Sequence, residues 1–453
     1  MPAGKDEIIS LIAVTDGRED SLRALCQTAA SVFEQTYLNL ELLIVRWNAE
    51  TASDCRAGTA AELVAEPAAV RHTDRKPEPF ANERLLRRIT ANRRVPVRVL
   101  ENAYASEAEA KNAGIAAAAG QWLLFLNCGD WMDSLMAEQL YFRAKWGGAG
   151  LALCGLEQEF EEGRTAYLRP ETELLTDKCT FLNTLFAGYY RDGLLGAASN
   201  QLFRTSLVRE TGVSFQPMAS AALEHTVFFM RYLQHCDTIC ILPTVLLTAF
   251  PEFIRRNPAT PQQEMEDAFL LLNAYDTLFD SAAPDDEVVN DMNNEMLGYL
   301  LRCGEQVCYA ERSGRLSREE SQQALERFAG REAFQKLLSQ TSPEGVWNCL
   351  ASLLLRTKRY RLYRQLLRLR LSLDTAAGRV QQEVEAEADR LYETAAERLE
   401  RGTAETEAAT AAADVEVEEI EENEQKTPEA SADANAETEP KEKEAKCQSS
   451  ENQ

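Results

Sequence analysis

The chain of 453 residues is 45% hydrophobic and 8% aromatic, enough to bury two cores, and its formal net charge of −25 disfavours nucleic-acid binding. No run reaches the roughly 18 apolar residues of a membrane-spanning helix, and the N-terminus does not resemble a signal peptide. The eleven cysteines lack the spacing of a zinc site, so we expect a cytoplasmic protein with free thiols.

The first fifty residues predict a strand-helix-strand unit. Residues 7–14 and 40–45 are apolar runs of strand length, and residues 20–35 between them carry apolar side chains at helical spacing. Such a unit joins two parallel strands by a right-handed crossover. Asp16 and Arg46, which follow the two strands, should therefore lie side by side where the strands end.

A third strand and a capped helix follow. Residues 95–99 predict a strand near a sheet edge because Pro96 lies within it. Ser106 and Glu109 have the spacing of a capping box, with Ser106 as N-cap and Glu109 reaching back. The helix that they begin, residues 107–119, is rich in small residues, which would let it press closely against the sheet.

A buried strand at residues 122–126 ends abruptly in the polar corner Asn127-Cys128-Gly129-Asp130. In an open α/β sheet the carboxyl ends of the strands face the ligand crevice, so Asp130 is placed to contact a ligand or a metal. The alternative is that Asp130 caps the following helix. We expect further strands at residues 151–156 and within 238–247, where Pro243 indicates a sheet edge.

The second half of the chain has a helical pattern and an acidic end. We expect an α/β domain over residues 1–250 and a helical bundle packed against it over residues 251–402. Its predicted helices are 264–279, 287–311, 318–328, 343–355, 356–373 and 376–401. Residues 403–453 hold 16 acidic residues and four lysines, and we expect a disordered tail that serves for solvation or for docking to a basic partner.

Residues 350–373 alternate leucines and tyrosines with seven basic residues. One interpretation is a basic amphipathic helix on an anionic membrane surface, where a lipid-linked acceptor would be found. The other is that the apolar stripe packs inside the bundle while the arginines pair with acids, for which residues 381–401 are candidates.

Four phrases of the first half resemble the opening half of family 2 glycosyltransferases: residues 9–17, 31–45, 111–115 and 120–131. The resemblance implies a GT-A fold and the transfer of a sugar from a nucleotide diphosphate donor to a glycan or lipid-linked acceptor, with Mg²⁺ or Mn²⁺. It implies donor binding by Asp16, Arg46, Lys111, Asn127 and Asp130, and catalysis by Glu224 and His225. Tyr189, Tyr190 and Arg191 would contact the acceptor, or would serve only in packing.

The acidic positions of that family are altered at three places. Where the family has an Asp-Asp-Gly-Ser phrase after the second strand, this chain has Arg46-Trp47-Asn48-Ala49. At the metal motif, Asn127 and Gly129 replace the metal-binding aspartates, which leaves Asp130 as the lone metal contact. Where the family has a Glu-Asp catalytic motif, this chain has Glu224-His225.

Two hypotheses follow from these departures. In one, the chain is an inverting transferase with rearranged groups, in which His225 is the base, Asp130 contacts a metal and Arg46 offsets phosphate charge. In the other, the chain is an inactive relative that binds an active glycosyltransferase. Either protein would be cytoplasmic or peripheral at the inner face of the membrane.

Overall fold

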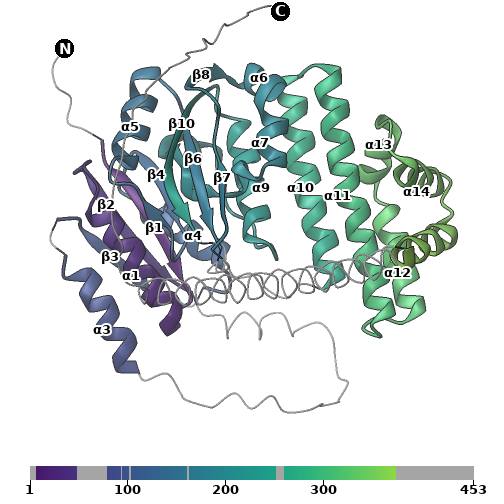
Figure 1. The fold of residues 1–453 in the computed structure, drawn as a ribbon, viewed down its shortest axis with the longest axis horizontal. Helices are drawn as coiled ribbons and strands as arrows, with labels where there is room; N and C mark the ends of the chain where they lie inside the picture. Colours follow the sequence, from purple (N-terminus) through teal and green to yellow (C-terminus); the bar gives the residue numbers. More distant parts are fainter. Residues whose placement is uncertain are drawn as a thin grey trace, which may run out of the picture. The chain divides into compact units, whose positions relative to one another are not determined.

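The structure is a computed structural model that describes residues 7–47, 79–92, 94–101, 104–160, 163–250 and 260–373 (Figure 1). The described residues up to Leu371 belong to one compact unit. The predicted helix at 376–401 and the predicted tail at 403–453 lie outside the described residues. The boundary at residue 250 stays a prediction.

A ten-stranded mixed sheet forms the first half of the chain. Its strands are β1 Ile9–Thr15, β2 Leu40–Arg46, β3 Val97–Glu101, β4 Trp122–Leu126, β5 Trp131–Met132, β6 Leu151–Glu159, β7 Thr165–Leu168, β8 Leu174–Asp177, β9 Gln201–Arg204 and β10 Thr238–Ala249. The order is β3-β2-β1-β4-β9-β6-β10-β5, with β7 beside β6 and β8 beside β10. The first four strands run parallel, as do β6 and β10.

The strand predictions are confirmed in the parallel block. Strands β1, β2 and β4 are buried along nearly their whole length, as their continuous apolar runs predict. Strand β3 lies at the edge of the sheet. Strand β10, however, is paired along most of its length, and Pro243 falls where its register with β6 is irregular.

Helices cover the sheet and connect its strands. They are α1 Glu19–Phe33, α3 Pro79–Thr90, α4 Glu107–Ala117, α5 Met136–Gly147, α6 Lys178–Phe181, α7 Ala187–Arg191, α8 Thr205–Thr211 and α9 Ala221–Leu233, with a π-helical turn at Leu182–Phe186 between α6 and α7. Helix α4 packs on β1 and β2. A Cβ at Gly114 would lie 2.6 Å from Ile12 Cγ2, so this glycine sets how closely α4 approaches β1.

Ser106 caps helix α4 as predicted, and its Oγ accepts from the backbone N–H of Glu109 at 3.2 Å. The Glu109 carboxylate reaches back to the N–H of Ala105 at 2.9 Å. The first turn of α4 is therefore fixed at the carboxyl edge of the sheet.

Helices α10 to α14 form the helical region: α10 Pro261–Ala282, α11 Asp286–Arg312, α12 Arg318–Ala329, α13 Glu332–Gln340 and α14 Val346–Arg356. Residues 360–373 are helical as well. Helix α10 packs on α9 and α11, which joins the helical region to the α/β region in one unit (Figure 1). The predicted fold class, an α/β sheet followed by a helical region, is confirmed.

Three arginines of the predicted basic helix pair with α11. Arg368 and Arg364 meet the buried Glu311, and Arg370 Nη1 lies 2.8 Å from Glu305 Oε1. These acids precede the basic segment, whereas the partners proposed at 381–401 lie outside the described residues. Within the described part of the chain, no helix is long and apolar enough to cross a membrane.

Candidate functional site

Asp16 and Arg46 lie on neighbouring strand ends, as the sequence predicts. Thr15 pairs with Arg46, and Arg46 pairs with Glu101 on β3. The Arg46 Nη1 atom lies 3.0 Å from Glu101 Oε1 in a partly exposed ion pair. The Asp16 Oδ1 atom accepts from the N–H of Arg18 at 3.1 Å. A carboxylate and a guanidinium thus follow neighbouring strands at the carboxyl edge of β1 and β2.

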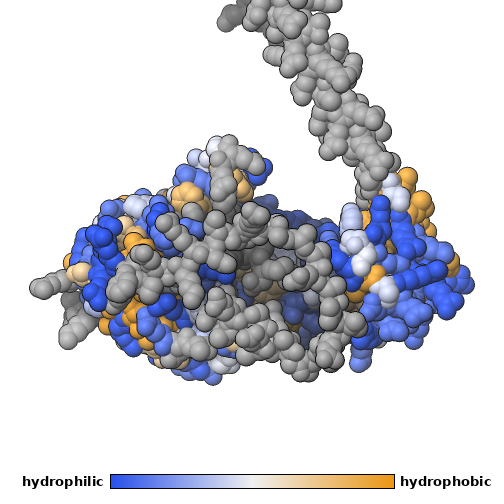
Figure 2. Space-filling view, turned by 90° about the horizontal axis from the view of Figure 1, so that it is seen from below, coloured by the Kyte–Doolittle hydropathy of each residue, from blue (hydrophilic) through white to orange (hydrophobic). Residues whose placement is uncertain are grey.

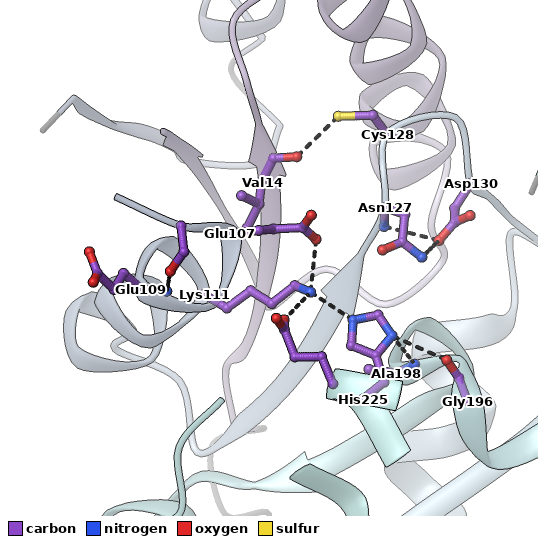
Figure 3. Close-up of polar contacts among 12 residues, drawn as sticks. Val14, Glu107, Glu109, Lys111, Asn127, Cys128, Asp130, Gly196, Ala198 and His225 are labelled. Carbon is purple, nitrogen blue, oxygen red and sulfur yellow. Dashed lines mark hydrogen bonds and ion pairs between the residues drawn. The ribbon is translucent and has the colours of Figure 1, made fainter. Parts of the chain in front are cut away.

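The corner after β4 is held by hydrogen bonds between its own residues. Asp130 Oδ2 accepts from the backbone N–H of Asn127 at 3.0 Å and from its side-chain Nδ2 at 3.1 Å (Figure 3). Asp130 is 1% exposed, and burial raises the pKa of its carboxyl from 3.8 to about 6, although the Asn127 hydrogen bonds lower it. Asp130 therefore stabilises the corner from inside.

Cys128 and Gly129 attach the same corner to its neighbours. The Cys128 thiol donates to the carbonyl of Val14 at 3.2 Å, and burial raises the pKa of the thiol to about 12. Gly129 has φ +100°, which favours glycine, and its N–H donates to Thr28 Oγ1 at 2.9 Å. A glycine at the second metal position of the family motif is therefore used for backbone geometry.

The candidate metal ligands do not fit a divalent ion at this corner. Mg²⁺ and Mn²⁺ prefer several oxygen ligands, and carboxylates above all. Asn127-Cys128-Gly129-Asp130 offers one carboxylate, which is buried and already accepts two hydrogen bonds. These residues therefore do not support a divalent-metal site at Asp130.

A second cluster joins α4 to α9 around the ammonium group of Lys111 (Figure 3). Lys111 Nζ lies 2.8 Å from Glu107 Oε1, 2.9 Å from Glu224 Oε1 and 2.7 Å from His225 Nε2. Lys111 is 3% exposed, and the Glu224 and His225 side chains are buried with it. The structure thus brings together three residues that the resemblance assigned to donor binding and catalysis.

The protonation states of the cluster follow from its contacts. Burial lowers the pKa of Lys111, but Glu107 and Glu224 outweigh this effect and raise it overall, so the ammonium is charged. Burial and the Lys111 charge hold the pKa of His225 well below 6.5. His225 Nε2 then accepts from Lys111, and Nδ1–H donates to the carbonyl of Gly196 at 3.2 Å.

Two residues of this neighbourhood were missed from the sequence. Glu107 was predicted only as the start of a helix, although its spacing of four residues from Lys111 is that of a helical ion pair. Phe215 faces the Lys111 ammonium at 5.1 Å from its ring centroid. Asn112 binds both the N–H and the carbonyl of Phe215 at 2.9 Å, so the residue after Lys111 holds that ring in place.

Of the predicted acceptor residues, Arg191 contacts the helical region, and the two tyrosines contact phenylalanines near α6 and α7. Arg191 on α7 pairs with Asp291 and Glu295 on α11. Tyr190 is stacked on Phe186 with ring centroids 6.2 Å apart. These contacts match the packing alternative, and acceptor binding by these residues stays a prediction.

Comparisons with known proteins identify the fold. No protein-family model matches the chain, and no curated protein matches it. Among solved structures, S. aureus TarS 1–349 in complex with UDP-GlcNAc matches with a TM-score of 0.53 at 14% identity, over 80% of this chain and 90% of that one. The same protein in complex with UDP gives a TM-score of 0.51 at 15% identity, with the same coverage.

This likeness shows the fold alone, and it is the GT-A fold that the resemblance implied. A match over 80% of the chain must extend beyond residue 250, so it also includes part of the helical region. A mannosyltransferase from Pyrobaculum calidifontis, in complex with GDP-Man and Mn²⁺, matches at a TM-score of 0.39, which is too low to carry an argument.

Proposed function

We propose that this GT-A protein binds a nucleotide-sugar donor at the carboxyl ends of β1, β2 and β4 and transfers the sugar to a glycan or lipid-linked acceptor in bacterial glycan synthesis. The observation that carries the proposal is the likeness, over most of the chain, to a structure in complex with UDP-GlcNAc. The polar side chains at that edge support it, because ligands of open α/β sheets bind outside the carboxyl ends of the strands.

Positive charge for a donor diphosphate is available at this edge from Arg46. Its guanidinium pairs with Glu101 but is partly exposed, whereas Lys111 is buried with its three N–H groups engaged. A guanidinium donates two parallel hydrogen bonds to phosphate oxygens without a metal. We assign Arg46 to the diphosphate, with Asp16 after β1 and Asn127 after β4 as further donor contacts.

Catalysis by Glu224 and His225 stays a prediction. A catalytic base must reach the proton of the acceptor hydroxyl. Both side chains are buried, and the lone pair of His225 Nε2 accepts from Lys111. Proton transfer to His225 therefore requires Lys111 to move away first. Of the two carboxylates on Lys111, Glu107 is the more accessible, with 29% of its side chain exposed.

A second candidate function is that of an inactive GT-A protein that partners an active glycosyltransferase. The burial of Asp130 and His225 favours it, since a metal ligand and a base both need access to substrate. In this case the sheet edge still binds a donor or its nucleotide, without turnover.

The experiment is a binding and turnover panel. Thermal stabilisation by UDP- and GDP-sugars, UDP and GDP is measured with Mn²⁺ and with EDTA, and donor hydrolysis is followed for each compound that binds. Binding with hydrolysis supports the transferase, and binding without hydrolysis supports the inactive partner. Absence of any stabilisation would refute donor binding. Arg46→Ala should weaken binding, whereas Arg23→Ala, on the exposed side of α1, should not.

A peripheral membrane contact at the inner face of the cell membrane is supported by the surface of the helical region. Leu350 and Leu353 on α14 are 42% and 57% exposed, and Lys358, Arg359 and Arg361 follow them in exposed positions. Figure 2 shows hydrophobic surface among hydrophilic residues at this end of the protein. Apolar and basic side chains together favour an anionic bilayer.

Vesicle flotation tests this contact. The protein should bind vesicles that contain phosphatidylglycerol and fail to bind pure phosphatidylcholine, and Arg359→Glu with Arg361→Glu should abolish binding. Equal binding of wild type and this variant to the vesicles would show that this surface is not the membrane contact. Trp146→Ser removes another large side chain, 75% exposed on α5, and should leave flotation unchanged.

A further inference from the structure

Three acceptor atoms from two helices converge on one point that a cation occupies. Glu107 Oε1 comes from the first turn of α4, and Glu224 Oε1 and His225 Nε2 come from the first turns of α9. A lysine ammonium has three N–H donors, and all three are matched here at 2.7 to 2.9 Å. The three acceptor atoms surround the Lys111 ammonium as ligands surround a metal ion, but this cation is part of a side chain.

The acceptors are oriented by contacts outside the cluster. The bond from His225 Nδ1–H to the Gly196 carbonyl, at 3.2 Å, aims the Nε2 lone pair at the centre of the cluster. The Phe215 ring, which Asn112 holds through two backbone hydrogen bonds, presents its electron-rich face to the same point. Each device favours a positive charge at that point, whatever carries it.

The ligand atoms are also those of a transition-metal site. Two carboxylate oxygens and one imidazole nitrogen lie within 4.8 Å of one another. Zn²⁺ and Mn²⁺ accept this combination of ligands. With Lys111 present, two carboxylates and one ammonium leave a net charge of −1, whereas a divalent ion in its place would neutralise them.

We propose that Glu107, Glu224 and His225 form a cation site whose resident cation is the Lys111 ammonium, and that removal of this ammonium turns it into a divalent-metal site. The cation that clamps α4 to α9 is then supplied by the chain itself. The wild-type cluster accordingly excludes divalent metals, because Lys111 Nζ fills the position that they would take.

The proposal is independent of donor binding, and metal titration of the purified full chain tests it. Lys111→Met replaces the ammonium by an apolar side chain of similar length. Without metal, this variant should unfold at a lower temperature than wild type, because the buried Glu224 and the partly exposed Glu107 lose their partner. ZnCl₂ or MnCl₂ should restore the unfolding temperature, and calorimetry should give one Zn²⁺ per chain.

Control variants identify the ligands. In the Lys111→Met background, Glu224→Gln should weaken Zn²⁺ binding by at least about tenfold, since it removes one anionic ligand. Lys336→Met removes a lysine that lies near Asp276 and Asp280 on the surface, without a histidine, and should create no Zn²⁺ site. Wild type should show no change in unfolding temperature with ZnCl₂, MnCl₂ or EDTA.

Two results on folded protein would overturn the proposal. One is a folded Lys111→Met variant that binds no metal. The other is wild-type metal binding that Glu224→Gln abolishes, because metal would then compete successfully with Lys111. If Lys111→Met does not fold alone, refolding with ZnCl₂ should recover it. If ZnCl₂ does not recover Lys111→Met, although the Lys111→Met/Glu224→Gln variant folds, the proposal is also contradicted.

Discussion

Replacement of Asp130 by Asn should make the protein more stable at neutral pH. It should also remove the contribution of Asp130 to the pH dependence of the unfolding free energy. The Asp130 carboxyl is 1% exposed, and burial raises its pKa from 3.8 to about 6. Because the folded-state pKa lies above the unfolded value, ionisation of Asp130 costs stability as pH rises from about 4 to about 6. The amide introduced by Asp130→Asn would carry no charge, and its Oδ1 would still accept from the two Asn127 donors.

The magnitude follows from the same change in pKa. An increase from 3.8 to about 6 corresponds to about 3 kcal/mol of unfolding free energy. The difference in stability between Asp130→Asn and wild type should therefore grow by up to about 3 kcal/mol between pH 4 and pH 7. Below about pH 4, Asp130 is protonated in both states, and the difference should no longer depend on pH.

Equilibrium urea unfolding at a series of pH values measures this difference. The reference variant is Asp177→Asn, because Asp177 is exposed and accepts from the N–H of Thr180 at 3.0 Å, which lowers its pKa. Its contribution is lost only below about pH 4, so its difference from wild type should stay constant between pH 5 and pH 7. An Asp130→Asn difference that is equally flat over this range would refute the reasoning.

Three further predictions concern packing and charge. Gly114→Ala forces a methyl group against β1 and should cost about 1–3 kcal/mol of unfolding free energy, whereas Gly188→Ala, whose Cβ meets no atom within 4 Å, should be neutral or stabilising; urea midpoints compare the two. Asn112→Ala removes two hydrogen bonds to the Phe215 backbone and should cost about 2–3 kcal/mol, and a loss under about 0.5 kcal/mol would show that Phe215 is held otherwise. Arg46→Ala breaks only a partly exposed ion pair, so its thermal midpoint should change little, within about 1 kcal/mol, while calorimetry should show weaker donor binding.

Most elements of the fold are predictable because their apolar periodicity is clear. The buried runs at Ile9–Thr15 and Trp122–Leu126 and the capped helix Glu107–Ala117 match the sequence prediction to within a few residues. The short strand Gln201–Arg204 is harder to place from the sequence. Its place between β4 and β6, antiparallel to both, depends on contacts with distant residues that no local pattern shows.

The candidate site is predictable in its positions but not in its contacts. The family-like phrases place Asp16, Arg46 and Asp130 at strand ends, and the structure has them there. They do not reveal that Asp130 binds Asn127 or that His225 meets Lys111, because these contacts depend on side-chain direction and burial. Only the ion pair between Glu107 and Lys111 could have been predicted from helical spacing, because the two residues are four positions apart.

The most direct test of the central claim is a crystal structure of the protein grown with the nucleotide sugar that stabilises it most. The diphosphate should lie at the carboxyl edge of β1 and β2, with the Arg46 guanidinium on its oxygens and the Lys111 cluster unchanged. A donor bound elsewhere on the protein, or an unbound edge at saturating donor, would contradict this claim.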